Sequence, residues 1–193
     1  MGRVSQAQAA QNRERIVAVA ARLFRERGIG GVSVADVMAE AGLTHGGFYK
    51  HFASKDALVA EAVTAAFTGR PAPDPGTYLS AEHRDDPGGG CPTAGFGGDI
   101  AKNLGGPATR AAYAQGVEAF ARLLTTHPGA GADAGTTQPG TAHPEAGTEP
   151  DLAALSTMVG ALLLSRATAG TDLSDRILAA ARAALTAHPA QDA

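Results

Sequence analysis

The sequence has little that could cross-link, anchor or export the chain. Its 193 residues include one cysteine, Cys91, so no disulfide can form within a single chain. The longest apolar run, from Val159 to Leu164, is far shorter than the roughly 20 residues that a membrane-spanning helix needs. The first residues do not follow the pattern of a secretory signal, in which a basic start precedes an apolar core. We therefore expect a reducing, cytoplasmic location and no membrane partner.

The sequence also lacks the residue spacings that are typical of a catalytic or metal-binding site. The six histidines are scattered, and no pair has metal-ligand spacing beside cysteine or carboxylate partners. No G-x-S-x-G motif occurs, and the glycines at 95–98 lack the preceding strand of a phosphate-binding loop. We predict no metal, no cofactor and no enzymatic activity. A small-molecule enzyme remains the weakest alternative.

Charge is modest but unevenly distributed. The net charge of −3 does not by itself favour a nucleic-acid partner. Residues 1–67, however, carry 8 Lys and Arg against 6 Asp and Glu, a net of +2, whereas residues 68–193 carry 8 against 13, a net of −5. A mildly basic head on an acidic body is compatible with reversible binding to DNA.

Residues 33–55, SVADVMAEAGLTHGGFYKHFASK, have the pattern of two short helices joined by a tight turn. Ser33 and Asp36 form an N-terminal capping box, and apolar residues follow at helical spacing. Gly42 then supplies the left-handed residue that commonly ends a helix, and Thr44 can cap a second helix whose inward residue is Phe48. A helix, a short turn and a second helix make up the helix-turn-helix unit that enters the DNA major groove.

The flanking residues extend this pattern. An amphipathic helix is expected from about Gln6 to Arg27, and Ser54 caps another that starts at Lys55. Over residues 20–62, AARLFRERGIGGVSVADVMAEAGLTHGGFYKHFASKDALVAEA, the chain resembles the TetR family of bacterial one-component repressors. The later segments YLSAEHRDDPGGGCPTAGFGGDIA and LSTMVGALLLSRA are similar to one TetR subgroup. The resemblance implies an all-α fold, with a helix-turn-helix head over residues 1–53 and an effector-binding and dimerisation domain over 54–193.

The resemblance also transfers DNA-contact roles to positions in and around the second short helix. Base-edge or phosphate contacts are expected from Ser33, Thr44, His45, Gly46, Tyr49, Lys50, His51 and Lys55. Lys50 could read a guanine edge or only a phosphate, and Ser33 could contact a phosphate in addition to capping its helix. For Tyr49 and His51 the alternative is that they only brace the fold. The expected partner is a double-stranded, near-palindromic operator.

After the head, Pro and Gly break the chain between residues 69 and 90, where only a short helix at about 77–82 fits. Cys91 and Pro92 open one further helix, and Pro107 opens the next, in which Gly116 is a candidate point of close approach. Residues 128–150 contain nine Gly or Pro and nothing aliphatic beyond Ala, which predicts a disordered loop rather than a binding element. Two apolar helices then follow, one from Asp151 to about Thr168 and one lined by Leu173 and Ile177.

In TetR-like proteins the last two helices form the dimer interface, and small residues between leucines would allow helices to approach closely. The residues assigned to a homodimer interface are Leu155, Val159, Leu162, Leu163, Ile177, Ala181 and Ala184. The alternative, that the two helices pack only within one chain, leaves too few partners for two largely apolar helices.

Two further groups of residues concern regulation. A pocket for a hydrophobic or aromatic effector is expected among the middle helices, lined by Phe67, Phe96, Tyr113, Phe120 and Met158, and its occupation would release the DNA. Cys91 stands at a helix N-terminus, where the dipole favours a thiolate, so it is a candidate sensor of oxidants or electrophiles. Its alternative role is that of a small, unreactive capping residue.

Overall fold

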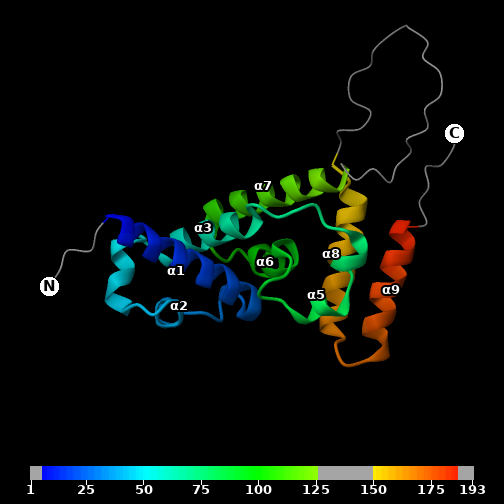
Figure 1. Cartoon of the computed structure of the whole chain (residues 1–193), viewed down its shortest axis with the longest axis horizontal. Coiled ribbons are helices and arrows are strands. Elements are labelled where there is room, and N and C mark those ends of the chain that lie inside the picture. Colours follow the sequence, from blue (N-terminus) through cyan, green and yellow to red (C-terminus); the bar gives the residue numbers. More distant parts are fainter. Residues whose placement is uncertain (1–5, 126–149, 187–193) are drawn as a thin grey trace, which may run out of the picture. The chain divides into compact units, whose positions relative to one another are not determined.

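The computed structural model describes residues 6–125 and 150–186, and every regular element within these ranges is helical (Figure 1). In chain order the elements are α1 (Gln6–Arg27), α2 (Val34–Glu40), the 3-10 helix η1 (His45–Lys50), α3 (Lys55–Phe67), α4 (Pro75–Tyr78), α5 (Ala81–Asp85), α6 (Pro92–Ala101), α7 (Gly106–Thr125), α8 (Leu152–Ala167) and α9 (Asp172–Thr186). The all-α fold class is thus confirmed. The loop predicted over 128–150 lies outside the described residues except for Pro150.

The helices divide into two compact units. The first contains residues 1–70 and 86–117, and the second contains residues 71–85 and 118–193. In the first unit α1 packs against α2, α3 and α6, and α3 also contacts α6. The boundary predicted between residues 53 and 54 therefore does not separate compact units, because the helix-turn-helix segment shares its core with α3 and α6.

The core of the first unit is built on the apolar face of α1. Ile16 and Ala20 are fully buried and Leu23 and Phe24 nearly so, as their helical spacing predicts. Val37, Phe48 and Leu58 bring α2, η1 and α3 onto this face, and Phe96 adds α6. The helices that carry the predicted DNA contacts are thus anchored from behind by one continuous hydrophobic cluster.

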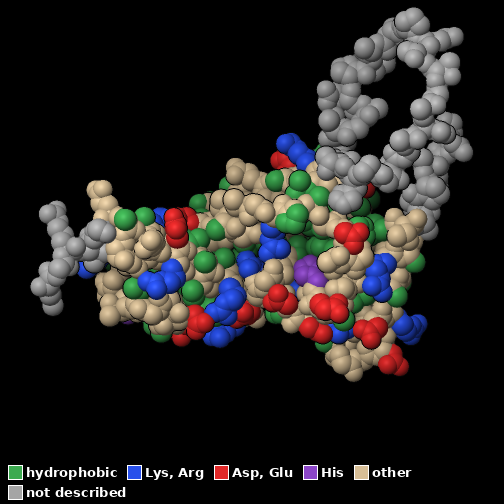
Figure 2. Space-filling model, viewed as in Figure 1, with side chains coloured by type: hydrophobic (Ala, Val, Ile, Leu, Met, Phe, Trp, Pro, Cys, Tyr) green, Lys and Arg blue, Asp and Glu red, His purple; other side chains and the backbone are tan. Residues whose placement is uncertain are grey.

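In the second unit α8 and α9 pack against each other as an antiparallel pair (Figure 1). Asp151 caps α8, because its side chain accepts a hydrogen bond from the Ala154 amide at 2.8 Å. Met158 and Leu162 are fully buried in this unit. Acidic side chains of α5 and of the first turn of α9 gather on the face drawn in Figure 2, in agreement with the negative charge of this part of the chain.

One helix expected between residues 77 and 82 is instead two short helices, α4 and α5. Asp74 caps α4 through the Thr77 amide at 2.8 Å, and Pro75 occupies its first turn. The Ser80 hydroxyl accepts from the His83 amide at 3.2 Å and starts α5. Two capping side chains six residues apart thus divide the segment.

Candidate DNA-binding site

The start of α2 is fixed by the predicted capping box. The Ser33 hydroxyl accepts a hydrogen bond from the Asp36 amide at 3.1 Å, and the Asp36 carboxylate accepts one from the Ser33 amide at 2.8 Å. The same hydroxyl donates to the Asp36 carboxylate at 2.6 Å. These bonds from the Ser33 side chain and amide hold the pKa of Asp36 below its ordinary value. The exposed end of α2 is therefore well defined.

The turn after α2 also has its predicted geometry. Gly42 has a φ of +68°, in the left-handed region that favours glycine. Its amide donates to the Ala39 carbonyl at 3.0 Å, and the Leu43 amide donates to the Met38 carbonyl at 2.8 Å, the two bonds of a Schellman helix end. This turn sets the angle at which the chain leaves α2 for η1.

The second short helix differs from the expectation at its beginning. It is a 3-10 helix, and Thr44 makes no side-chain capping hydrogen bond to it. Gly46 and Gly47 lie in its first half, where each weakens a helix by about 1 kcal/mol relative to alanine. The helix is held by its aromatic residues instead. Phe48 is fully buried and stacks on Phe52 with 5.5 Å between ring centroids.

Most of the predicted DNA-contact side chains share the exposed surface around η1. Thr44, His45, Gly46 and Lys50 are exposed, and Tyr49 is 69% exposed. No other atom lies within 4 Å of the position that a Cβ on Gly46 would take, so the backbone there is open to close approach. The Tyr49 ring packs edge-on against the buried Phe48 ring, with 5.2 Å between the ring centroids. Its phenol group is exposed, and its position is fixed by this contact.

Lys55 and His51 are less exposed than the others. The Lys55 ammonium donates to the Ile29 carbonyl at 2.6 Å and lies 5.9 Å from the centroid of the Phe24 ring. It thereby joins the start of α3 to the turn between α1 and α2. His51 is half-buried, with its ring 6.4 Å from that of Phe52. Both residues contribute to the packing of the head, whether or not they also meet a phosphate.

Two contacts that position this surface have no counterpart in the sequence pattern. The Ile29 amide donates to the Asp99 carboxylate at 2.5 Å, which ties the turn before α2 to the end of α6. Arg13 forms a two-fold ion pair with Glu61 and lies 4.6 Å from the centroid of the Phe52 ring. The partners are 70 and 48 residues apart in sequence, so helical spacing gives no signal for either contact.

The five residues expected to line an effector pocket fall into both compact units. Phe67 and Tyr113 meet edge-on in the first unit with 6.0 Å between centroids, and Phe96 is fully buried there. Burial, with a smaller contribution from Cys91, raises the pKa of Tyr113 to about 12, and its hydroxyl donates to the Thr93 carbonyl at 2.8 Å. Phe120 and Met158 belong to the second unit. A cavity of about 680 Å³ lies in the first unit and is lined by other residues of α6 and α7, between 100 and 114.

Cys91 occupies the predicted N-cap of α6, although its side chain does not cap the helix. The thiol is buried, with 2% of the residue exposed. Close by, the half-buried Arg25 guanidinium donates through Nε to the Gly88 carbonyl at 2.8 Å. Burial and the neighbouring Arg70 lower the pKa of Arg25 to about 10. A reagent in solvent would need local opening of the chain to reach the Cys91 sulfur.

The residues assigned to a dimer interface separate by exposure. Leu155, Leu162 and Ala181 are buried within their own chain, whereas Val159 and Ile177 are half-buried and Leu163 and Ala184 are exposed. Leu152 and Leu173, which the sequence did not single out for this role, are exposed as well. The first three are buried within the single chain, so only the others are on its surface.

Within the described ranges no helix is long and apolar enough to cross a membrane. Nor do His, Cys, Asp and Glu side chains of those residues gather in a group of three that could hold a metal ion.

Comparison with known families identifies the head. Residues 16–62, from within α1 to within α3, match the family model of bacterial regulatory proteins of the tetR family. The chain is 36% identical over 52 residues to the uncharacterised HTH-type transcriptional regulator YerO of Bacillus subtilis, covering 27% of this chain and 18% of that protein. It is 36% identical over 61 residues to the HTH-type transcriptional regulator AcrR of Shigella flexneri, covering 32% of this chain and 28% of that protein. The matched stretches thus span less than a third of these relatives.

Solved structures match over nearly the whole chain. The reduced form of NemR from E. coli superposes with a TM-score of 0.65 at 19% identity, covering 95% of this chain and 99% of that one. A TetR-family regulator from Cytophaga hutchinsonii gives 0.64 at 18% identity, covering 97% and 100%. At these identities the likeness concerns the fold.

Proposed function

Because residues 16–62 place this chain in the TetR family of bacterial regulatory proteins, we propose that it is a transcriptional repressor that binds operator DNA through α2 and η1. The observation that carries the proposal is the surface around η1. His45, Tyr49 and Lys50 are exposed there, while Phe48 and Phe52 anchor the same short segment in the core. Exposed polar side chains on a firmly anchored helix are what major-groove recognition needs.

The exposed residues divide into two proposed roles. His45 and Lys50 contact base edges, so their replacement changes which sequence is preferred. Tyr49 and Lys55 contact phosphates, which positions the head and contributes equally to all sequences. Gly46 allows the backbone to approach the sugar or a thymine methyl group. Ser33 adds a phosphate contact at the start of α2, next to its capping role.

Selection of binding sites from random duplex DNA tests the proposal. The wild type should enrich an inverted repeat with half-sites about one helical turn apart or slightly more. His45→Ala and Lys50→Ala should each alter the enriched bases at a cost of roughly 1 to 3 kcal/mol per lost base contact. Tyr49→Phe should weaken binding without altering the sequence. If no inverted repeat is enriched, or if the two alanine variants enrich the wild-type sequence, the assignment of this surface is wrong.

An inverted repeat requires a two-fold protein, and the surface of α8 and α9 supports a homodimer. Leu152, Ser156, Val159 and Leu163 follow one another along α8 at spacings of four, three and four residues. Leu173, Ile177, Ala180 and Ala184 repeat the same spacing along α9. All eight are at least partly exposed in the single chain. Two such stripes, apolar except for Ser156, suit a four-helix bundle formed by two copies.

Paired substitutions on α8 and α9 test the dimer without unfolding the chain. Leu163→Asp and Ala184→Asp place a charge on the stripes, so sedimentation should show a monomer in place of the wild-type dimer. Ala179→Asp makes the same change at an exposed position of α9 that faces away from both the stripe and α8. It should remain dimeric. A wild type that sediments as a monomer at micromolar concentration would exclude the proposal.

We further propose that a small hydrophobic or aromatic molecule releases the repressor from DNA. The support is the presence of a cavity large enough for such a molecule, since ligand sites commonly measure roughly 300 to 1,000 Å³. Release requires that the ligand bind the DNA-free conformation more tightly than the DNA-bound one. A gel-shift assay with a panel of small molecules on the selected repeat measures it directly.

A further inference from the structure

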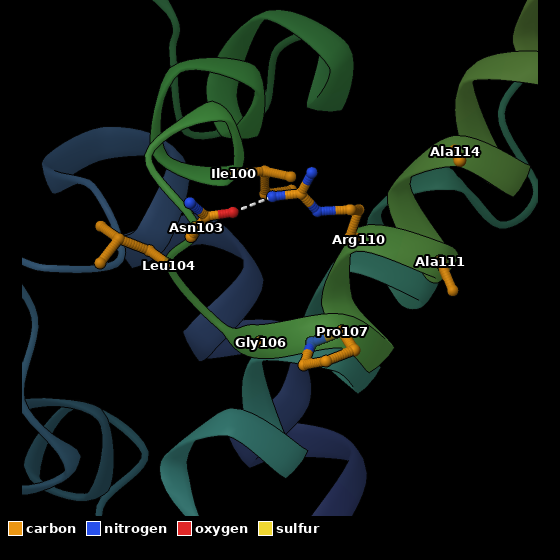
Figure 3. Close-up of a pocket in the computed structure, with 8 residues that line it drawn as sticks. All are labelled: Ile100, Asn103, Leu104, Gly106, Pro107, Arg110, Ala111 and Ala114. Atoms are coloured by element: carbon orange, nitrogen blue, oxygen red, sulfur yellow. Dashed lines mark hydrogen bonds between the residues drawn. The ribbon is translucent and has the colours of Figure 1, made fainter.

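The cavity at the junction of α6 and α7 has an apolar lining (Figure 3). Ile100 and Leu104 contribute from the end of α6 and the loop after it. Pro107, Ala111 and Ala114 follow along one face of α7. These side chains leave a volume of about 680 Å³, which suits a small organic molecule. Pro107, Ala111 and Ala114 are themselves exposed, so the site is an open groove in which the apolar part of a ligand would be partly taken out of water.

One charged group reaches into this lining. Arg110 extends from α7 and donates to the side-chain oxygen of Asn103 at the end of α6 (Figure 3). Asn103 has a φ of +65° because it ends α6 in the left-handed conformation, with the Leu104 amide donating to the Asp99 carbonyl at 3.1 Å. Asn103 is neutral and none of the lining residues is acidic, although the Asp56 carboxylate lies 3.7 Å from the position of a Cβ on Gly106. A planar guanidinium is well suited to bind a carboxylate through two parallel hydrogen bonds.

The cavity wall also touches the turn that precedes α2. A Cβ on Gly30 would lie 3.6 Å from Leu104, and the Asp99 carboxylate accepts the Ile29 amide at 2.5 Å. The carbonyl of the same residue, Ile29, accepts a hydrogen bond from the Lys55 ammonium of α3. The peptide groups of this turn are therefore held between the cavity wall and the helix that follows the DNA-binding segment.

We propose that this cavity binds a small carboxylate with an apolar body, such as a medium-chain fatty acid or an aryl-alkanoic acid. Arg110 pairs with the carboxylate, and the apolar side chains of α6 and α7 line one side of the remainder, which stays partly open to solvent. The occupant displaces the end of α6, and Asp99 and Leu104 transmit the shift to the turn before α2. This step rests on the proposed function, because it supplies the ligand class to which the repressor responds.

Calorimetric titration without DNA tests the site itself. Octanoate should bind saturably, and octanamide, with the same body and no charge, should bind more weakly. Because Arg110 is exposed, Arg110→Gln should raise the dissociation constant for octanoate by roughly 2- to 5-fold, the effect of one solvent-screened ion pair, and leave that for octanamide unchanged. Equal binding of acid and amide by the wild type, or no saturable binding of octanoate, overturns the proposal.

A second pair of variants tests the place of binding. Ala111→Leu fills the cavity and should weaken both ligands. Ala108→Leu is the matched control, because Ala108 is exposed on the same helix but does not line the cavity. It should bind octanoate as the wild type does. If the two variants bind octanoate equally well, the ligand does not occupy this cavity and the proposal fails.

DNA binding is measured separately, on the inverted repeat selected by the wild-type protein. Saturating octanoate should weaken the complex of the wild type. Asp99→Ala should bind octanoate normally and release DNA less readily, because the hydrogen bond to Ile29 is gone. Octanoate that binds through Arg110 without affecting the DNA complex refutes the coupling. A protein that binds octanoate but enriches no DNA sequence refutes the proposed function and leaves the ligand site standing.

Discussion

Gly116 is the position at which the smallest change should have the clearest effect. It lies in α7, and a Cβ added there would lie 2.6 Å from Cε2 of Phe67 and closer still to Cδ2 and Cγ. Favourable carbon contacts are roughly 3.5 to 4.0 Å, so the ring must move. Phe67 is the last residue of α3 and its ring meets Tyr113 edge-on, so moving it disturbs the contact between α3 and α7.

The expected magnitude follows from a comparison with Gly98. Overpacking of this kind costs about 1 to 3 kcal/mol, while alanine gains up to about 1 kcal/mol over glycine in a helix. Gly98 of α6 is exposed and has no atom within 4 Å of its would-be Cβ, so Gly98→Ala should gain the helical term alone. Both variants share the gain in helix propensity, so it cancels when their free energies of unfolding are compared. The free energy of unfolding of Gly116→Ala should therefore be lower than that of Gly98→Ala by about 1 to 3 kcal/mol.

Urea unfolding followed by circular dichroism gives both free energies of unfolding. A double-mutant cycle with Phe67→Leu identifies the cause, because a smaller and more flexible side chain should accept the added methyl group at a lower cost. If Gly116→Ala and Gly98→Ala stabilise the protein equally, α3 and α7 do not approach at this point. An unchanged cost in the Phe67→Leu background would show that the ring is not the obstacle.

Three further predictions concern the head and the cysteine. Ser33→Ala should lower the free energy of unfolding by about 1 kcal/mol near neutral pH. Since the pKa of Asp36 is lowered by folding, the stability from this carboxylate is present above its unfolded pKa and is lost as the pH falls through the folded one. The difference between wild type and Ser33→Ala should therefore narrow in acid, where the Ser33 hydroxyl keeps its bond from the Asp36 amide but loses its partner carboxylate. A difference that is the same at all pH values would contradict the pairing of the Ser33 hydroxyl with this carboxylate. Lys55→Ala should reduce the slope of log affinity against log salt by roughly one unit for a lost phosphate contact, whereas an unchanged slope confines Lys55 to its bond with Ile29. Cys91 should react with a thiol reagent only on unfolding, and Cys91→Ser should bind DNA normally, so rapid reaction of the native protein would reverse this view.

The sequence by itself determined the features that depend on neighbours three or four positions away. The capping box of Ser33 and Asp36, the left-handed Gly42 and the buried face of α1 were all predicted and are confirmed. Such features are local, because a helix end is satisfied by side chains of the same turn and a helix face is defined by its repeat. The family of the head came from the resemblance of residues 20–62 to TetR proteins, and the all-α fold was what that resemblance implied.

Only the tertiary structure decides which of several apolar residues on a helix are buried and which residues they contact. Leu162 and Leu163 are the same residue type in adjacent positions, yet the first is fully buried against its own chain and the second is exposed. Which of the two is buried depends on how α8 packs against its neighbouring helices, which no local repeat specifies. The bond between Asp99 and Ile29 likewise joins residues 70 positions apart, and it forms because the core brings α6 to the turn before α2. Long-range packing selects these contacts, so they become visible only when the chain is folded.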